Sequence, residues 1–426
     1  MLRIDELYKE LKSSNFLVDI DSRKIRKGSV FFAIKGDNFN GNEFISDALK
    51  NGSRLAISDE GNPNFNDNHN VIKVSNSLST LQELSKFHRK KCNAKVIGIT
   101  GSNGKTTTKE LIYSVLSSNF KTICSPGNYN NHIGLPLSLF EIRNDTEFAI
   151  IEMGANNFGE IAFLTSLCEP DYGYITNFGK AHLEGFMDIN GVIKAKTELY
   201  QWIIKNDKTL LINGEDKNQK KFDNHKNIIF GKSENFQYNF RENNNDYVNV
   251  ALGDYLFKTK LYGAYNYSNV CAAIALGLEF GIDKNQINQS LKSYQPKNNR
   301  SEIIKIGGKT IVLDAYNANP SSVEEAIKSF SILEGDKAII LGDMYELGKE
   351  SSIEHKKIIK LCEDNIDSRC IFIGEEFYNF SINKQNSNFF KNKSDFFNSN
   401  MEIREKNILI KGSRGMKMEE ILKHIQ

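Results

Sequence analysis

The chain has 426 residues, 39% of them hydrophobic and 11% aromatic, which is enough to bury the cores of about three domains. Its 55 basic and 53 acidic residues leave a net charge of +2, which argues against nucleic acid or a membrane surface as a partner. Six scattered cysteines without a C-x-x-C pair favour reduced thiols over disulfides or a zinc site.

The first 16 residues are charged where a signal peptide would be apolar, so they predict a folded helix. No stretch of the sequence stays apolar for the roughly 18 residues that a membrane-spanning helix needs. We therefore expect a cytoplasmic protein without membrane insertion, and a monomer is its expected state.

Residues 1–85 are predicted to form an N-terminal mixed αβ domain, because short apolar strands alternate there with helical and turn-rich stretches. The predicted strands are 29–34, 54–58 and 71–74. Two patches rich in asparagine, 62–70 and 241–247, predict surface loops.

Residues 86–295 follow a strand–turn–helix order that predicts a central α/β domain of the P-loop ATPase type. Apolar runs without alternation predict buried parallel strands; they lie at 95–100, 148–154, 171–178 and 209–214. A few antiparallel strands are expected over 226–262, and an apolar helix over 266–280.

A polar segment at 294–300 is a predicted hinge, and residues 296–426 beyond it are predicted to form a Rossmann-like C-terminal domain. Its expected strands lie at 310–315, 337–343, 370–374 and 407–413, and its expected helices near 320–334, 351–362 and 415–425. The overall expectation is an α/β fold of three domains.

Residues 95–111, KVIGITGSNGKTTTKEL, combine a strand, a glycine turn and a helix start. The usual phosphate-loop spacing, G-x-x-x-x-G-K-[ST], would need a glycine where Ile99 stands. Glycines still allow backbone N–H groups to face a phosphate, and the helix N-terminus adds positive charge. We interpret the segment as a nucleotide site with a shortened spacing; the alternative is a plain turn in which Lys105 is incidental.

Several polar residues outside the loop are weak evidence when taken singly. Glu152 ends a predicted strand, where an acid can hold Mg²⁺ or can simply be a surface carboxylate. On chemistry alone, His182 would be a loop histidine and Lys196 a solvated helix charge. An arginine such as Arg300 can clamp a γ-phosphate, and an acid at a strand end, such as Asp314, can bind ribose hydroxyls.

The segment TGSNGKTTTKE (100–110) resembles the loop of the Mur ligases, the ATP-dependent amide-forming enzymes of peptidoglycan synthesis, whose relatives include folylpolyglutamate synthases. Its TTTKE part is most similar to the branch that adds D-alanyl-D-alanine. Three C-terminal segments also resemble this branch: YNANP (316–320), LGDMYELG (341–348) and KGSRGMKME (411–419). AHLEGF (181–186) with AKTE (195–198) is also similar to a family segment.

The resemblance implies a set of nucleotide-site residues that spans the central and C-terminal domains. The implied ATP ligands are Gly101, Ser102, Asn103, Gly104, Lys105, Thr106, Thr107, Asn266, Asn269, Arg300 and Asp314. The implied Mg²⁺ ligands, for two ions, are Thr106, Glu152, His182 and Lys196, the last of these carbamylated by CO₂. The implied catalytic residues are Lys105, Glu152, His182 and Lys196.

The resemblance also implies substrate residues, because 21–52 is similar to the family's uridine-nucleotide-binding domain and 126–139 to a substrate-side loop. The candidates are Ser22, Arg23, Gly36, Asn40, Gly41, Asn42, Asn128, Asn131, Tyr316 and Asn317. Two positions depart from the family pattern: Tyr265 stands for a common histidine, and Leu313 stands for the first of two aspartates.

The activity that the resemblance implies is ATP-dependent joining of D-alanyl-D-alanine to UDP-N-acetylmuramoyl-tripeptide through an acyl phosphate, which gives the pentapeptide precursor of peptidoglycan. The third residue of that tripeptide is left open between meso-diaminopimelate and lysine. Closure of the C-terminal domain about the 294–300 hinge is our expectation for gating. The alternatives are another Mur-type or folylpolyglutamate-type ligase, a P-loop NTPase switch, and a nucleotide-binding protein without catalysis.

Overall fold

The structure is a computed structural model that describes residues 3–60, 70–242, 247–364, 368–381 and 387–425. Its contacts divide the chain into two compact units. The first unit holds residues 1–98, 120–154 and 160–172, and the second holds residues 99–119, 155–159 and 173–426. Among the described residues, no helix is both long and apolar enough to cross a membrane.

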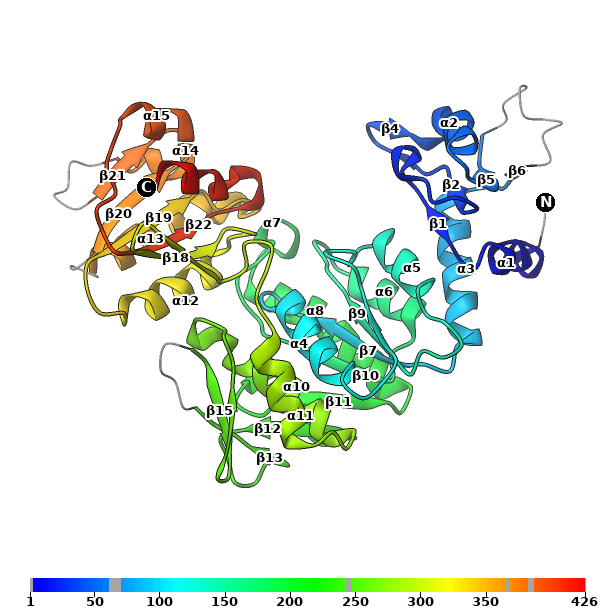
Figure 1. The fold of residues 1–426 in the computed structure, drawn as a ribbon, viewed down its shortest axis with the longest axis horizontal. Coiled ribbons are helices and arrows are strands. Elements are labelled where there is room, and N and C mark those ends of the chain that lie inside the picture. The colour runs from blue at the N-terminus through cyan, green and yellow to red at the C-terminus, as the bar shows by residue number, and fades with distance from the viewer. Residues whose placement is uncertain (1–2, 61–69, 243–246, 365–367, 382–386, 426) are drawn as a thin grey trace. The chain divides into compact units, whose positions relative to one another are not determined.

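The first unit begins with a four-stranded parallel sheet in the order β1-β2-β5-β6. The strands are β1 (Val18–Asp19), β2 (Val30–Phe32), β5 (Leu55–Ser58) and β6 (Val71–Lys73). Side chains of β2 alternate between two cores. Val30 and Phe32 pack with α1 (Ile4–Ser13) and α3 (Ser77–Lys91), whereas Phe31 packs with α2 (Ile45–Lys50). Helices α1 and α3 also contact each other (Figure 1).

The predicted N-terminal helix and the strands predicted over 29–34, 54–58 and 71–74 are confirmed by α1, β2, β5 and β6. A small hairpin, β3 (Lys35–Gly36) with β4 (Phe39–Asn40), follows β2. The 3-10 turn η2 (Gly41–Phe44) directly follows the hairpin, and another, η1 (Ser22–Lys24), precedes β2. Of the surface loop expected over 62–70, residues 62–69 lie outside the described residues.

A seven-stranded sheet has the order β13-β12-β11-β10-β7-β9-β8. Its strands are β7 (Lys95–Thr100), β8 (Thr122–Cys124), β9 (Phe148–Glu152), β10 (Tyr172–Ile175), β11 (Thr209–Asn213), β12 (Asn227–Gly231) and β13 (Tyr238–Asn239). The strands predicted at 95–100, 148–154, 171–178 and 209–214 are therefore confirmed as β7, β9, β10 and β11. Helices α5 (Gly134–Leu139) and α6 (Glu160–Cys168) belong to the first unit.

The few antiparallel strands expected over 226–262 are confirmed from β14 onward, but the first two strands of this range are parallel. Strand β12 pairs in parallel with both β11 and β13, and the short helix α9 (Lys217–Lys220) lies in the connection that returns the chain from the end of β11 to the start of β12. The antiparallel sheet consists of β14 (Arg241–Glu242), β15 (Asn249–Leu252) and β16 (Tyr255–Lys258). Residues 241–242 were expected in a loop and form a strand, whereas 243–246 lie outside the described residues.

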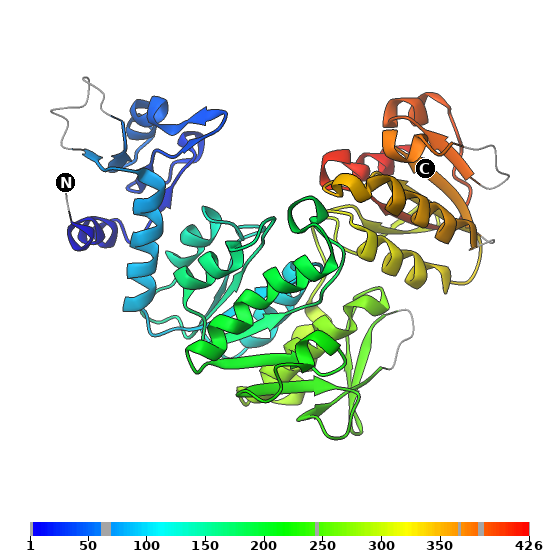
Figure 2. The same cartoon turned by 180° about the vertical axis from the view of Figure 1, so that it is seen from behind.

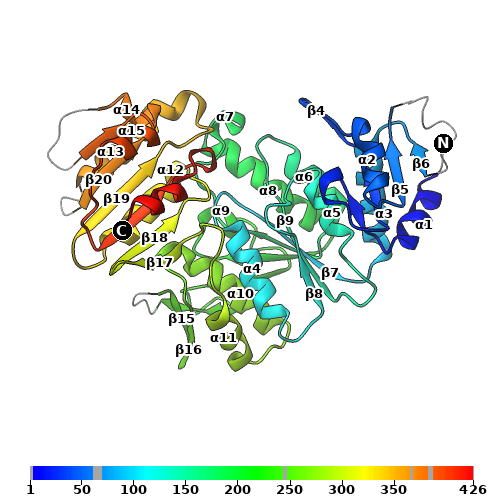
Figure 3. The ribbon, with the colours of Figure 1, turned by 45° about the horizontal axis from the view of Figure 1, so that its top comes forward.

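In the second unit, α4 (Lys105–Leu116) packs against α10 (Tyr267–Glu279) and α11 (Lys284–Ser293), as Figure 3 shows. Helix α10 confirms the apolar helix predicted over 266–280 and follows the turn η4 (Ala264–Asn266). Residues 269–277 are all buried, so this helix is enclosed on nearly every side. Helices α7 (Leu183–Phe186) and α8 (Ile189–Lys205) also pack together in this unit.

The C-terminal part of the second unit is a six-stranded sheet in the order β17-β18-β22-β19-β20-β21. The strands are β17 (Glu302–Ile306), β18 (Lys309–Asp314), β19 (Lys337–Gly342), β20 (Ser368–Ile373), β21 (Ser387–Phe390) and β22 (Asn407–Lys411). All neighbours are parallel except β17, which forms a hairpin with β18. Helices α12 (Pro320–Ser331) and α13 (Ser351–Asp364) lie side by side (Figure 2).

The same part of the chain contains three shorter helical elements: η5 (Gly348–Glu350), α14 (Glu375–Tyr378) and α15 (Lys393–Asn398). The four predicted C-terminal strands and the first two predicted helices are confirmed. The helix expected near 415–425 is present in 3-10 rather than α form, as the two short 3-10 helices η6 (Arg414–Met416) and η7 (Met418–His424). The left-handed backbone of Lys417, with φ 48°, separates them. The domain limits predicted at 85/86 and 295/296 stay predictions.

Candidate active site

The glycine turn before α4 needs both of its glycines. Gly101 has φ 144°, and a Cβ at this position would overlap the Thr176 hydroxyl. Gly104, the residue before the first helical turn, has φ 77°, and a Cβ there would lie 2.8 Å from Asn269 Oδ1. The backbone therefore curves around the start of α4 in a way that only glycine allows. Such a turn directs N–H groups and the helix dipole toward an anion.

Replacing Gly101 with alanine is expected to raise the KM for ATP by roughly tenfold or more, because the new methyl group would strain the turn and displace Thr176. Steady-state kinetics at varied ATP would measure this. The matched control is Gly281→Ala, since Gly281 has φ 77° and open space around the added carbon. An equal change of KM in both variants would contradict a specific role for the turn.

Residues that follow β10 form hydrogen bonds with the glycine turn. The Asn103 backbone N–H donates to Asn177 Oδ1 at 3.0 Å, and its carbonyl accepts from Asn177 Nδ2 at 3.1 Å and from Thr176 Oγ1 at 2.5 Å. The Ser102 hydroxyl donates to the Gly179 carbonyl at 2.9 Å. The loop is thus fixed through its backbone, which preorganises it for a ligand.

The helix side of the loop presents a lysine and a run of threonines. Lys105 Nζ donates to the carbonyls of Gly101 at 2.7 Å and Ser102 at 3.1 Å, so its ammonium lies over the turn. Thr106 is buried, with 4% of its surface exposed. Thr107 is buried as well. A lysine and a hydroxyl at these positions suit phosphate and Mg²⁺ respectively.

The two predicted asparagines lie at the start of α10: Asn266 is the residue before the helix, and Asn269 is in its first turn. Asn269 Oδ1 accepts from the Thr108 hydroxyl at 3.0 Å, and Asn269 Nδ2 donates to Asn266 Oδ1 at 3.0 Å. Asn266 Nδ2 donates to the Tyr262 carbonyl at 2.8 Å. These bonds connect the first turn of α4 to the start of α10. Contact of either asparagine with a nucleotide stays a prediction.

Glu152 lies in the first unit at the end of β9, with 1% of its surface exposed. Its Oε1 accepts from Asn130 Nδ2 at 2.8 Å, and its backbone N–H donates to Ser125 Oγ at 3.1 Å. Asn130 was not among the sequence candidates, although it lies between Asn128 and Asn131, which were. Asn128 is exposed, and Asn131 Oδ1 accepts from backbone N–H groups at the start of α5.

His182 and Lys196 both contact the ring of Phe186, which lies in α7. Lys196 is buried, with its Nζ 3.4 Å from the Ala155 carbonyl and 5.3 Å from the Phe186 ring centroid. His182 has a left-handed backbone with φ 52°, and its Nδ1 lies 2.5 Å from Glu346 Oε2. The imidazole lowers the pKa of the Glu346 carboxyl from its ordinary value.

Glu346 belongs to the LGDMYELG segment, yet no sequence signal marked it as a partner of His182. Carboxylates that hold a functional histidine in orientation are common at active sites. The LGDMYELG segment as a whole resembles the family, but that resemblance does not single out Glu346 as a partner of His182. Among the described residues, no three His, Cys, Asp or Glu side chains gather as a metal-binding group.

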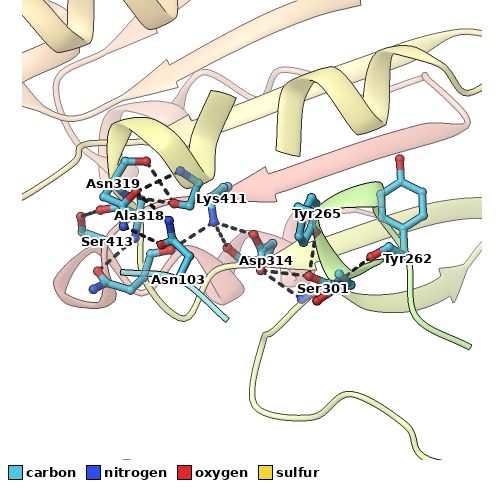
Figure 4. A network of polar contacts seen from close by, with 12 residues as sticks. Asn103, Tyr262, Tyr265, Ser301, Asp314, Ala318, Asn319, Lys411 and Ser413 are labelled. Atoms are coloured by element: carbon cyan, nitrogen blue, oxygen red, sulfur yellow. Dashed lines mark hydrogen bonds and ion pairs between the residues drawn. The ribbon is translucent and has the colours of Figure 1, made fainter. Parts of the chain in front are cut away.

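Asp314 ends β18 and forms an ion pair with Lys411, whose Nζ lies 2.5 Å from Asp314 Oδ2 (Figure 4). Asp314 Oδ1 accepts from the Ser301 backbone N–H at 3.0 Å, and the Ser301 hydroxyl lies 2.7 Å from the Tyr265 hydroxyl. Lys411 belongs to the KGSRGMKME segment, but no sequence signal marks it as the partner of Asp314. Tyr265, which stands for the family's histidine, thus connects to Asp314 through Ser301, and burial raises its pKa well above the ordinary value.

Arg300 lies with its guanidinium carbon 3.5 Å from the centroid of the Tyr316 ring. The Tyr316 backbone N–H donates to the Asn299 carbonyl at 3.0 Å, so the hinge segment and the YNANP segment are held together. The carbonyl of Asn317 accepts from Lys411 Nζ at 3.2 Å. Leu313, where the family has an acid, is buried in the C-terminal core.

The candidates of the N-terminal domain fall into two places in the first unit. Asn40 and Asn42 are hydrogen-bonded to each other at 3.0 Å, and Asn40 Nδ2 donates to the Glu60 carboxylate. Gly41 between them has no room for a side chain, because a Cβ would lie 2.7 Å from the Ile34 backbone. Gly36 has open space around it and lies in the β3–β4 hairpin. Ser22 and Arg23 lie apart from this group, on η1, where Arg23 is paired with Asp21 at 2.8 Å.

A cavity of about 550 Å³ lies at the carboxyl ends of β19 and β20, and its lining carries charges of both signs. Glu346 and Glu376 are among its acids, and Lys391 and Lys393 are its bases. At its base the Asp343 carboxylate accepts two backbone N–H bonds at 3.1 Å, and burial raises its pKa. Carboxyl ends of parallel strands are where ligands of open α/β sheets bind.

Three family models match the chain: "Mur ligase family, catalytic domain" over residues 17–89, "Mur ligase middle domain" over 99–277 and "Mur ligase, glutamate ligase domain" over 299–395. A UDP-N-acetylmuramoyl-tripeptide–D-alanyl-D-alanine ligase of Bacillus subtilis is 34% identical over 424 residues, which cover 96% of this chain and 92% of that protein. The chain belongs to the Mur ligase family.

Solved structures agree with this membership. A MurF from Acinetobacter baumannii matches with a TM-score of 0.85 at 25% identity, covering 98% of this chain and 97% of that one. A MurF ligase from Thermotoga maritima in complex with ADP matches with a TM-score of 0.83 at 25% identity, covering 96% of each chain. The three-domain α/β fold expected of this Mur ligase is confirmed, and so is its class, an ATP-dependent ligase that forms amide bonds.

Proposed function

We propose that this Mur ligase joins D-alanyl-D-alanine to UDP-N-acetylmuramoyl-tripeptide with ATP and so makes the pentapeptide precursor of peptidoglycan. The observation that carries the proposal is the match along nearly the whole chain to a Bacillus subtilis ligase named for that reaction. The glycine turn, Lys105 and the cavity of mixed charge in the C-terminal domain support it.

The reaction we propose has two steps. The terminal carboxylate of the tripeptide attacks the γ-phosphorus of ATP, the bond to the β-phosphate oxygen breaks, and an acyl phosphate and ADP result. The amine of the dipeptide then attacks the acyl carbon, and phosphate leaves with the electron pair of the C–O bond while the amine loses a proton. Lys105 and the turn's N–H groups would neutralise the transferred phosphoryl group, since positioning and charge stabilisation dominate such transfers.

The residues present fit a Mg²⁺ ion. Mg²⁺ in nucleotide sites takes one or two carboxylates and completes its shell with phosphates and water. The chain offers the Glu152 carboxylate, buried and oriented by Asn130, and the Thr106 hydroxyl at the helix start. When bound, the ion would neutralise the charge of the phosphates. By the family resemblance, Glu152 and Thr106 are each proposed as a ligand of such an ion.

A second ion is proposed at His182 and Lys196, which share Phe186 as a neighbour. Reaction of Lys196 with CO₂ would turn its amine into a carbamate, whose oxygens suit a hard cation. The buried position of Lys196 beside the Ala155 carbonyl would keep such a group in one place. Glu346 would orient the His182 ring through Nδ1.

The cavity at the ends of β19 and β20 is our proposed place for the dipeptide. D-alanyl-D-alanine is a small zwitterion, and the lining offers acids for its ammonium and lysines for its carboxylate. The uridine nucleotide is proposed to bind in the N-terminal domain near Asn40 and Asn42. Because ATP and nucleotide-linked substrates are cytoplasmic, we also propose a cytoplasmic location, and a monomer.

Phosphate release from ATP is expected to need both UDP-N-acetylmuramoyl-tripeptide and D-alanyl-D-alanine, because the acyl phosphate turns over only when the amine arrives. A coupled phosphate assay with each substrate left out in turn would measure this, with meso-diaminopimelate and lysine tripeptides compared. EDTA should abolish the release and excess Mg²⁺ should restore it.

The same assay separates the alternatives. Release that ignores the dipeptide but responds to another amine would indicate a different Mur-type or folylpolyglutamate-type ligase. Release without any acceptor would indicate an NTPase switch. The full-length match to D-alanyl-D-alanine-adding relatives favours the proposed substrate pair over both.

A further inference from the structure

Asn319 makes two different hydrogen bonds with one amide group. It is the N-cap of α12, and its Oδ1 accepts from the Ser322 backbone N–H at 2.9 Å. Its Nδ2 donates to Asn103 Oδ1 at 2.7 Å, on the glycine turn 216 residues earlier in the chain (Figure 4). In return, Asn103 Nδ2 lies 3.5 Å from Asn319 Oδ1. A helix cap needs only the oxygen, so the nitrogen is available for the second task.

The turn leaves only the side chain of Asn103 for this contact. Its backbone N–H and carbonyl are already bonded to Thr176 and Asn177 after β10. The Asn103 side chain is therefore the part of the turn whose orientation depends on the C-terminal domain. A side-chain amide has a fixed donor side and a fixed acceptor side, so its partner decides which way it faces.

The first turn of α12 approaches the loop so closely that a side chain on Gly179, which lies between them, would be crowded. A Cβ on Gly179 would lie 3.0 Å from Ser321 Cβ and 3.1 Å from Asn103 Nδ2. Next to it, the Lys180 backbone N–H donates to Ser321 Oγ at 2.9 Å. The contact between Asn319 and Asn103 is thus part of a fitted surface rather than a single isolated bond.

The C-terminal side of the contact is also anchored. Lys411, with 2% of its surface exposed, donates to the Asn317 carbonyl at 3.2 Å and pairs with Asp314. The Ser413 hydroxyl donates to the Ala318 carbonyl at 3.5 Å. Both bonds come from the end of β22, so the segment before α12 is held against its own sheet while it presents Asn319 to the loop.

We propose that Asn319 is a positioning residue for ATP, which orients Asn103 and the glycine turn through its side-chain N–H group. This rests on the proposed function, in which that turn holds the phosphates. The amide makes the geometry of the turn depend on the docked C-terminal domain. Without the donor, the turn keeps its backbone bonds but Asn103 loses its defined orientation, so ATP binds more weakly.

The test separates the two tasks of the side chain by substitution. Asn319→Ser keeps an oxygen that caps α12 but removes the N–H donor, whereas Asn319→Ala removes both. The KM for ATP is expected to rise about 3- to 10-fold in both variants, the effect of one lost neutral hydrogen bond, with a smaller change in kcat. The thermal midpoint is expected to fall in the alanine variant only.

The matched control is Asn76→Ser, because Asn76 caps α3 in the same way and accepts from the Ser79 backbone N–H at 2.7 Å. It should leave the KM for ATP unchanged. A double-mutant cycle adds a second readout: with Asn103→Ala as background, Asn319→Ser should change KM by less than twofold, since its partner is already gone.

Several results would overturn the inference. A wild-type KM in Asn319→Ser would show that Asn319 is a cap and nothing more. Equal increases in Asn319→Ser and Asn76→Ser, or additive effects in the cycle, would show that no specific contact is involved. The proposed function fails separately: if the unaltered protein releases no phosphate when both substrates are present, the function is wrong whatever Asn319 does.

Discussion

Replacing Lys105 with alanine is expected to lower the rate of phosphate release by roughly 1000-fold. This is the size of effect expected when one positive charge that stabilises the transferred phosphoryl group is lost. The Lys105 ammonium lies 2.7 Å from the Gly101 carbonyl and 3.1 Å from that of Ser102, directly over the turn. The next lysine along the chain, Lys109, is buried one helical turn further on. Initial rates of phosphate release with both substrates measure the effect.

The control for Lys105→Ala is Lys284→Ala. Lys284 is likewise the first residue of a helix, α11, where it follows the capping residue Asp283, but it is exposed and far along the chain from the turn. It should keep normal rates. Circular dichroism should show that both variants are folded. Normal turnover by Lys105→Ala would mean that the turn is not the phosphate site.

Elements set by local sequence were predictable. The strand expected at 95–100 is β7, and the helix expected to open at Lys105 is α4, because a glycine turn between an apolar run and a helix start is encoded within a few residues. The helix expected near 415–425 is present as well, but in 3-10 rather than α form. The segment has the composition of a helix, but the left-handed Lys417 divides it into two 3-10 turns.

The partners of the candidate residues were not predictable in the same way. Glu346 beside His182, Lys411 beside Asp314 and Asn319 beside Asn103 are all brought together by the tertiary fold. The resemblance located the segments that carry them, but a motif does not say which of its side chains faces another domain. The parallel pairing of β12 was missed for a related reason, since strand direction depends on the path of the connection and not on the strand's own residues.

Asp314 was predicted to bind the ribose of ATP, and in the structure it also forms an ion pair with the buried Lys411. Variants can distinguish these two roles. Asp314→Asn is expected to lower the free energy of unfolding by about 3 kcal/mol, because it leaves the Lys411 ammonium buried without a counter-charge. The Lys411 side chain is 3% exposed and that of Asp314 is 15% exposed. Urea titration followed by circular dichroism would measure the loss.

The control for this stability effect is Glu324→Gln. Glu324 pairs with Lys328 at 2.7 Å, but both side chains are about half exposed, so breaking this pair should change stability by no more than about 0.5 kcal/mol. If Asp314→Asn proves as mild as Glu324→Gln, the buried pair does not stabilise the C-terminal domain.

The double variant Asp314→Asn with Lys411→Met separates structure from ligand binding. Removing both charges should recover most of the lost stability, because no buried charge is then left alone. If Asp314 also holds the ribose, the KM for ATP should stay raised in the stable double variant. If KM returns to normal together with stability, Asp314 acts only by holding Lys411, and through it the Asn317 carbonyl and the start of α12.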